Sequence, residues 1–182
     1  SRLSKDNRWS SFPSLAAAWR ISDEAFFNSS LISNLKLRAN YGTLGSSNIG
    51  YWDYQQTINT FPTIAMGRDQ HIEPGGTNIR LANNNLRWET LTQKNFGLDL
   101  GLLKNKLTAT AEYYISETKD VLTEAPITLT TGNDGGNPVV NAASLKNSGF
   151  ELSLTYSEAE KAFKYNTTLN VTTIKNEVLS LG

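Results

Sequence analysis

The sequence predicts an all-β protein: an antiparallel transmembrane β-barrel segment, about six strands of a larger barrel, with long extracellular loops. Three observations predict it. Apolar and polar residues alternate along six segments, short and long connections alternate between them, and aromatic residues gather at the ends of the apolar faces. No run of about 18 apolar residues is present, so no transmembrane helix is expected. Barrel strands have unremarkable mean hydropathy, because lipid-facing and lumen-facing residues alternate.

The first three predicted strands span residues 14–21, 34–42 and 94–103. In each, every second residue is apolar, the period of a strand with one buried face. Polar residues such as Lys36 and Asp99 occupy the alternate positions. The three apolar faces consist of Leu15, Ala17, Trp19 and Ile21; Leu35, Leu37, Ala39 and Tyr41; and Phe96, Leu98, Leu100 and Leu102.

The last three predicted strands span residues 106–116, 148–156 and 163–174. They show the same alternation, and threonine and aromatic residues favour the strand assignment. Their apolar faces consist of Leu107, Ala109, Ala111, Tyr113 and Ile115; Phe150, Leu152, Leu154 and Tyr156; and Phe163, Tyr165, Thr167, Leu169 and Val171.

The connections follow the order short, long, short, long, short, which is typical of outer-membrane barrels. Residues 22–33 are expected to hold one helical turn that begins at Ser22. Residues 43–93 form the longest loop, and a tight turn is expected at Lys104-Asn105. Residues 117–147 and 157–162 complete the series.

Hairpin pairing tests the strand assignments, because a slip of one residue sets an apolar face against a polar one. A turn at Lys104-Asn105 places Phe96 opposite Tyr113. For the last hairpin we expect Tyr156 opposite Phe163, which in turn sets Leu154 against Tyr165 and Phe150 against Leu169.

With the short turns at the bottom, the aromatic residues of the apolar faces fall into two bands with aliphatic residues between them. Aromatic rings favour the lipid headgroup level, which predicts a membrane girdle. Thr167, at mid-strand, is an exception. The upper band consists of Tyr41, Phe96, Tyr113 and Phe150, and the lower band of Trp19, Tyr156, Phe163 and Tyr165.

The alternate face is too polar for the core of a soluble sandwich, because burying unpaired charges is costly. In a wide barrel this face lines water or a plug. Six strands cannot close such a barrel, so further strands are expected beside these. The charged residues of this face are Arg38, Asp99, Glu112, Glu151 and Lys164.

Four stretches resemble the barrel of SusC/RagA-type TonB-dependent transporters. They are NRWSSFPSLAAAWRISDEAFF, NLKLRANYGTLGSSNIG, NNNLRWETLTQKNFGLDLGLLKNKLTATAEYYISETKDVL and NAASLKNSGFELSLTYSEAEKAFKYNTTLNVTTIKNEVLSLG. Residues 53–80 and 123–138 carry little of the resemblance. It implies that residues 1–182 form part of one β-barrel domain of such a transporter, in the bacterial cell outer membrane.

The resemblance further implies a barrel of about 22 strands with an amino-terminal plug that contacts TonB; the plug domain is absent from residues 1–182. The implied partners are a SusD-like surface lipoprotein, TonB, outer-membrane lipid, and a glycan or peptide substrate. No cofactor is implied, and the expected role is transport and not enzymatic catalysis.

The loops offer three candidate sites. Tyr51, Trp52 and Tyr54 form an aromatic cluster on which sugars or peptides stack, although such rings also pack within loops. Asp69, His71 and Glu73 alternate, so an extended chain would put them on one face. With a single histidine and no further motif, a solvated loop face is expected there in preference to a metal site. The stretch from Gly132 to Pro138 resembles a turn-rich loop tip more than a calcium loop.

The composition and the missing motifs limit the alternatives. Seventeen lysine and arginine residues balance seventeen aspartate and glutamate residues, whereas a nucleic-acid binder needs a basic face. The sequence has no cysteine, which excludes thiol catalysis, disulfides and thiolate zinc sites. It also starts without a signal-peptide pattern, so any targeting signal is expected to lie outside it. A soluble β-sandwich that binds carbohydrate is the main alternative, and a soluble hydrolase domain is remote because no catalytic constellation is present.

Overall fold

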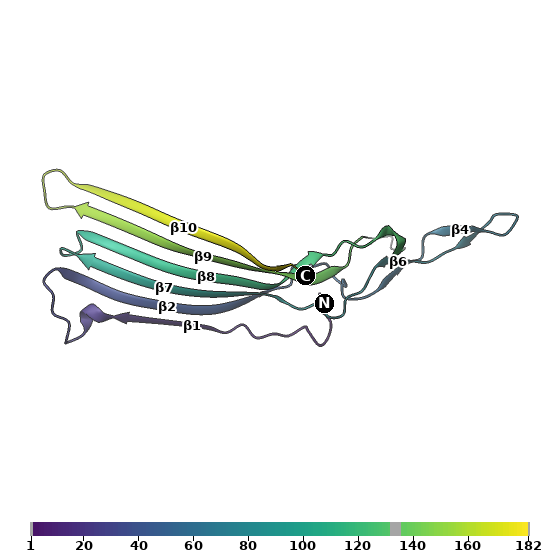
Figure 1. The fold of residues 1–182 in the computed structure, drawn as a ribbon, viewed down its shortest axis with the longest axis horizontal. Helices are drawn as coiled ribbons and strands as arrows, with labels where there is room; N and C mark the ends of the chain where they lie inside the picture. Colours follow the sequence, from purple (N-terminus) through teal and green to yellow (C-terminus); the bar gives the residue numbers. More distant parts are fainter. Residues whose placement is uncertain (1, 132–135, 182) are drawn as a thin grey trace.

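A computed structural model describes residues 2–131 and 136–181, and its main element is one antiparallel sheet of six long strands (Figure 1). The strand order is β1-β2-β7-β8-β9-β10, so each long strand pairs with the next one along the chain. This architecture confirms the predicted fold class. The strands are β1 (Ser14–Arg20), β2 (Ile32–Ser46), β7 (Glu89–Leu102), β8 (Leu107–Glu124), β9 (Val139–Glu158) and β10 (Tyr165–Leu181).

The sheet has two distinct ends. At the turn end, β1, β7 and β9 connect to their neighbours, and at the loop end lie the long connections and both chain termini (Figure 1). The strands extend further toward the loop end than predicted: β9 has 20 residues, about twice what a tilted strand needs to cross a bilayer. Residues 139–147 lack strict alternation and lie beside a bulge between Thr118 and Val121, which hid this extension.

The predicted hairpin between β7 and β8 is confirmed. Phe96 pairs with Tyr113 and Leu100 with Ala109. Leu103, Lys104 and Asn105 make the turn with φ angles of 53°, 57° and 65°. These left-handed conformations match the twist that a tight hairpin connection requires.

The predicted pairing of β9 with β10 is wrong by four positions. Leu154 pairs with Leu169 and not with Tyr165, and Phe150 pairs with Thr173. Because four is an even number, the same faces remain together. Strand β9 continues to Glu158, so Phe163 lies in the turn, and Thr167 pairs with Tyr156 near the turn end.

The helical turn predicted between β1 and β2 is present as a 3-10 helix, η1 (Ile21–Asp23). It begins at Ile21, one residue before the predicted start at Ser22. Its N-cap residue is Arg20, and no side chain makes a capping hydrogen bond. The Trp19 indole Nε1 donates a hydrogen bond to Glu24 Oε1 at 2.9 Å, which ties the end of β1 to this connection.

The longest predicted loop contains a projecting arm with four short strands (Figure 1). Pairing of β3 with β6 forms the base of the arm, and pairing of β4 with β5 forms its tip. Strands this short show no readable alternation, so the sequence did not predict them. They are β3 (Thr57–Asn59), β4 (Thr63–Met66), β5 (His71–Pro74) and β6 (Thr77–Arg80).

A small apolar cluster, the loop-end cluster, joins the amino-terminal segment to the loops. Leu86 is completely buried at its centre, and Ile49, Trp88 and Leu122 pack against it. The other buried members are Leu3, Tyr54 and Val139. A second 3-10 helix, η2 (Leu129–Thr131), precedes β9. No helix within residues 2–131 and 136–181 is long and apolar enough to cross a membrane.

Candidate functional site

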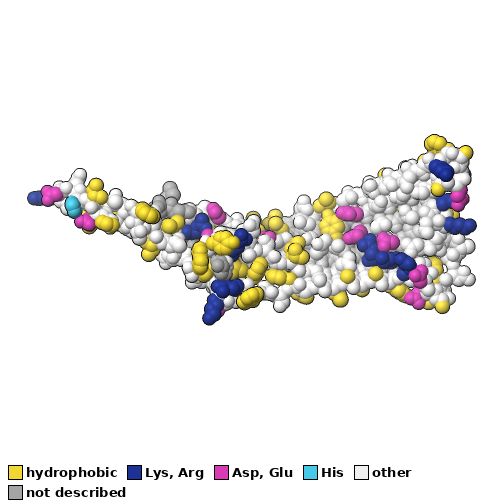
Figure 2. Space-filling model, turned by 180° about the vertical axis from the view of Figure 1, so that it is seen from behind, with side chains coloured by type: hydrophobic (Ala, Val, Ile, Leu, Met, Phe, Trp, Pro, Cys, Tyr) yellow, Lys and Arg dark blue, Asp and Glu magenta, His cyan; other side chains and the backbone are white. Residues whose placement is uncertain are grey.

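The polar face of the sheet carries a charged network in its middle. The Arg38 guanidinium on β2 donates to both carboxylate oxygens of Asp99 on β7, from Nε at 3.0 Å and from Nη2 at 3.2 Å. Arg38 Nη2 also donates to Glu112 Oε2 on β8 at 3.4 Å. Figure 2 shows Lys, Arg, Asp and Glu side chains gathered over one face of the sheet.

Gly97 makes the longer of these contacts possible. It lies between Arg38 and Glu112 in the same row of paired residues. A Cβ atom at this position would lie 2.9 Å from both Cζ and Nη2 of Arg38. Glu151 on β9 pairs with Glu112, so the row continues with a second carboxylate. All three side chains of the ionic network are about one quarter exposed, which suits a face that meets water or polar protein.

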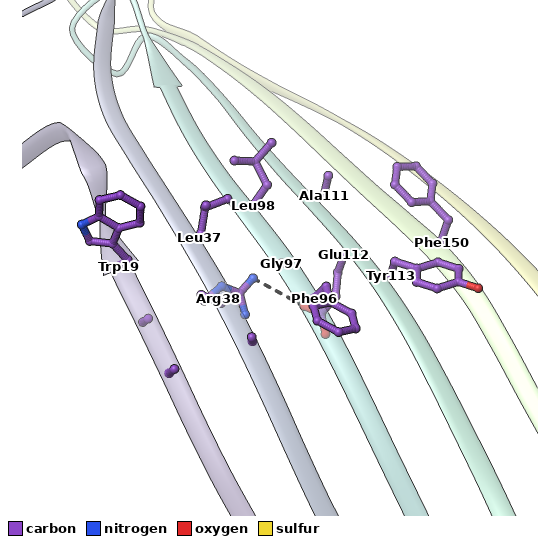
Figure 3. Close-up of a pocket in the computed structure, with 13 residues that line it drawn as sticks. Trp19, Leu37, Arg38, Phe96, Gly97, Leu98, Ala111, Glu112, Tyr113 and Phe150 are labelled. Atoms are coloured by element: carbon purple, nitrogen blue, oxygen red, sulfur yellow. Dashed lines mark hydrogen bonds and ion pairs between the residues drawn. The ribbon is translucent and has the colours of Figure 1, made fainter. Parts of the chain in front are cut away.

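The opposite, apolar face contains a shallow hollow of about 540 Å³ (Figure 3). Ala17, Ala39 and Ala111 leave space between six larger apolar side chains around them. The alternation of strand side chains keeps Arg38 and Glu112 on the other side of the sheet, although they contribute to the floor of the hollow. The larger neighbours are Trp19, Leu37, Phe96, Leu98, Tyr113 and Phe150.

The predicted upper-band residues lie close together on the apolar face. Phe96, Tyr113 and Phe150 form one continuous row across β7, β8 and β9. Tyr41 lies one row nearer the loop end, opposite Lys94. Phe96, Tyr113 and Phe150 are between 39% and 56% exposed, so about half of each remains open on this face.

The predicted lower-band residues form two groups. Tyr165 lies between two rings, with centroid distances of 5.8 Å to Tyr156 and 5.7 Å to Phe163. Trp19 lies instead beside Phe26, at 6.4 Å between centroids. Sequence reasoning missed Phe26, because it lies outside any strand. It follows the short helix η1 in the β1–β2 connection.

The three aromatic candidates for substrate contact do not share one open surface. Tyr54 is only 7% exposed and belongs to the loop-end cluster, so its ring supports the loop from within. Tyr51 is exposed and lies 5.1 Å from Arg2 Cζ in a cation–π arrangement. Trp52 is also exposed, with a φ angle of 72°. Tyr51 and Trp52 stay predicted contacts.

The alternating Asp69, His71 and Glu73 do not converge. Asp69 lies in the turn at the tip of the arm, before β5 begins. His71 Nε2 and Glu73 Oε1 are 3.7 Å apart and both side chains are exposed. Within the described residues, no group of three or more His, Asp or Glu side chains is arranged to hold a metal ion. The candidate loop at Gly132–Pro138 lies largely outside the described residues, which resume at Gly136.

An ionic cluster joins two connections at the turn end. The Glu158 carboxylate is 3% exposed and lies 3.6 Å from both Lys106 Nζ and Lys161 Nζ. Lys106 Nζ also lies 2.5 Å from Glu160 Oε2. The backbone N–H of Glu160, followed by the two lysines, lowers the pKa of Glu158 against the opposing effect of desolvation. The cluster fixes the β9–β10 turn against the β7–β8 turn.

Comparison with known proteins places this sheet in a family. The family described as "TonB dependent receptor-like, beta-barrel" matches residues 1–179. The chain is 34% identical to the TonB-dependent receptor SusC of Bacteroides thetaiotaomicron over 187 aligned residues, which cover 100% of this chain and 18% of SusC. It is 33% identical to the TonB-dependent receptor P39 of Formosa agariphila, covering 100% of this chain and 17% of that receptor.

Solved structures agree. The RagAB peptide importer in its "closed-closed" state matches with a TM-score of 0.81 and 27% identity, over 100% of this chain and 19% of the importer chain. Its "open-open" state gives the same TM-score. The chain thus spans about a fifth of the length of the relatives it matches. The six-stranded sheet with one charged and one apolar face belongs to the TonB-dependent receptor-like β-barrel family.

Proposed function

We propose that the chain forms six adjacent wall strands of a TonB-dependent transporter in the bacterial outer membrane, and that the complete transporter imports large nutrients, glycans or peptides. The observation that carries the proposal is the sheet itself. One face holds the ionic network around Arg38, and the other holds exposed aliphatic and aromatic side chains. A barrel wall needs both: an apolar surface toward lipid and a polar surface toward the lumen.

Both edges of the sheet support a larger barrel. Every residue of β1 and of β10 is exposed, and the outer backbone edge of each has no neighbouring strand among the described residues. Unpaired edges of this length promote aggregation in soluble proteins and cannot lie in a bilayer. Further strands of the same barrel would pair with them. A soluble carbohydrate-binding sandwich would need a second sheet over the apolar face, and residues 2–131 and 136–181 form none.

The aromatic bands give the proposed position in the membrane. The row from Phe96 to Phe150 would lie at the outer headgroup level, and the group around Tyr165 would lie at the periplasmic level. The two bands follow a diagonal across the rows, because Trp19 on β1 shares a row with Leu152 on β9, which is two same-face rows nearer the loop end than Tyr156. Tilted barrel strands produce such a diagonal.

The relatives suggest the partners. RagAB is described as a peptide importer, and SusC as a TonB-dependent receptor. We infer a SusD-like lipoprotein at the loop end, contact with TonB through a plug outside this chain, and surrounding outer-membrane lipid. The proposed role is binding and passage of a nutrient, with no chemical conversion by these residues. Tyr51 and Trp52 at the loop end are the proposed contacts with that nutrient.

Uptake by intact cells tests this function. Cells with and without the gene of the complete transporter are each given one fluorescent glycan or peptide at a time. We expect the labelled compound to accumulate only in cells that have both the gene and TonB. A Trp52→Ala variant should lower uptake several-fold while a variant of exposed Phe61, on the distant arm, should not. Equal uptake in cells that lack the gene, for every glycan and peptide tried, would contradict the proposal.

A further inference from the structure

The apolar face changes character just beyond the upper aromatic row. In the next row toward the loop end, Lys94 on β7 and Lys175 on β10 flank Ile115 and Ser148. One row further on the same face, Lys146 on β9 lies in register between Glu117 on β8 and Glu177 on β10. The period of two puts Lys94, Lys146 and Lys175, here called the lysine patch, on the same face as Phe96 and Phe150.

The two glutamates beside Lys146 in its row, Glu117 and Glu177, form ion pairs with other lysines. Lys175 Nζ lies 3.5 Å from Glu177, and Glu117 pairs with Lys119 at 3.3 Å. Lys94 and Lys146 have no ion-pair partner among residues 2–131 and 136–181. Two ammonium groups without an ion-pair partner in the described chain therefore lie on the same face as the aromatic row, and a lysine stem is long enough to carry its charge away from an apolar surface.

The features beneath the patch complete an amphipathic order. From the loop end toward the turn end, the face presents ammonium groups, then the row that holds Ala39 and the rings of Phe96, Tyr113 and Phe150, then the row that holds Ala111. The hollow lies across these last two rows, with the three rings on its wall (Figure 3). An anionic lipid has the same order: a charged headgroup, an interface and an alkyl chain. Aromatic rings lie at the interface level in membrane proteins, which sets the patch level with lipid phosphates.

We propose that this face binds one phosphate-bearing lipid of the outer leaflet, with its phosphate at the lysine patch and one acyl chain in the hollow over Ala39 and Ala111. The inference rests on the proposed position of the sheet in the outer membrane. A second copy of the barrel fits the face less well, because a two-fold contact would bury Lys94 and Lys146 without partners.

Native mass spectrometry of the complete transporter in detergent tests the inference. The probe is lipid A that carries phosphate, compared with the same lipid after phosphatase treatment and with inorganic phosphate as competitor. The Lys94→Gln, Lys146→Gln and Lys175→Gln changes should each weaken retention of the phosphorylated lipid by about fivefold, and Ala111→Leu should weaken it by filling the hollow. Lys36→Gln, on the polar face, and Lys164→Gln, at the turn end, are controls that should retain it.

Two results would support the inference. Lys94→Arg should retain the phosphorylated lipid where Lys94→Gln loses it, and the phosphatase-treated lipid should not bind the unchanged protein. Equal retention of both lipids, displacement by inorganic phosphate alone, or a lipid-free dimer that the glutamine changes abolish would each overturn it. Uptake and heat-modifiable migration of the same variants separate this failure from failure of the proposed function. A transporter that inserts and imports without retaining the lipid refutes only the lipid site.

Discussion

The Arg38 guanidinium crosses the backbone of β7 at Gly97 and reaches the Glu112 carboxylate, with 3.4 Å between Nη2 and Oε2. Through its simultaneous contacts with Asp99, this one side chain joins three neighbouring strands on the polar face. Arginine suits the position because its rigid fork has enough donors for two carboxylates.

Gly97→Ala should displace the Arg38 guanidinium, because the added Cβ would lie 2.9 Å from its Cζ. We expect the Glu112 contact to be lost and the free energy of unfolding to fall by about 1 kcal/mol, measured by urea unfolding of the complete transporter in detergent. Gly42→Ala is the matched control, since its Cβ would meet Ser14 Cβ at an ordinary 3.7 Å. Equal stability of the two variants would show that Arg38 does not depend on the glycine.

Leu86→Ala should loosen the loop end without unfolding the sheet. Leu86 has no exposed surface and centres the loop-end cluster, and truncating such a leucine costs about 2–5 kcal/mol. Limited proteolysis should then cut residues 47–88 faster, while heat-modifiable migration of the barrel is retained. Leu44→Ala, at a 67% exposed position, should leave cleavage unchanged. Protection of the loop in both variants would argue against the cluster as its anchor.

Lys104→Gly should stabilise the β7–β8 hairpin. The Lys104 φ angle of 57° lies in the left-handed region, which costs a side chain about 1 kcal/mol relative to glycine. Lys104→Val should destabilise the hairpin, because a β-branched residue tolerates this region least. Urea unfolding should rank glycine above lysine and lysine above valine, and the reverse order would contradict the turn geometry.

The β9–β10 turn should lose protection against amide hydrogen exchange at acid pH. The pKa of Glu158 is lowered from 4.5, so its contribution to stability is present above pH 4.5 and is lost as pH falls through the lower folded value. The pKa of Lys106 is raised from 10.5, first by its hydrogen bond with Glu160, so its contribution persists below pH 10.5 and is lost only above the raised value.

Amide hydrogen exchange over residues 157–166, corrected for intrinsic rates, measures this dependence. The charged and titratable groups that face Glu158 and Lys106 are Tyr156, Glu160 and Lys161. We expect protection to fall below pH 4.5 in the unchanged protein, and a Glu158→Gln variant to lose that dependence. Glu73→Gln, on the arm, should behave like the unchanged protein. An acid-independent turn would refute a structural role for the Glu158 carboxylate.

Alternation predicted the faces of the sheet well, and one hairpin in full. For β7 and β8, a tight turn leaves room for a single register, so Phe96 could be placed opposite Tyr113 from the sequence. For β9 and β10, the alternation accepted any even shift. In the observed register Glu158 ends β9 opposite Tyr165, and its carboxylate contacts Lys106 of a different turn. A contact between separate hairpins leaves no local signal in the sequence.

The loop end was the least predictable part. Tyr54 resembles Tyr51 and Trp52 in the sequence, yet it is buried against Leu3 and Leu86, which come from distant segments. The arm was missed because β3 has three residues and β4 has four, fewer than a periodic pattern needs. The ionic network was predicted only as a polar face, because the reach of Arg38 across Gly97 depends on the pairing of three strands.

The accessibility of successive residues on β9 tests the central claim, that one face of this sheet meets lipid and the other the lumen. Single cysteines replace Leu152, Ser153, Leu154 and Thr155 in turn in the complete transporter, which is spin-labelled in bilayers and exposed to oxygen or to a water-soluble nickel complex. We expect high oxygen accessibility at positions 152 and 154 and low accessibility at 153 and 155, a period of two. Uniform accessibility along the strand, or highest oxygen accessibility at 153 and 155, would contradict it.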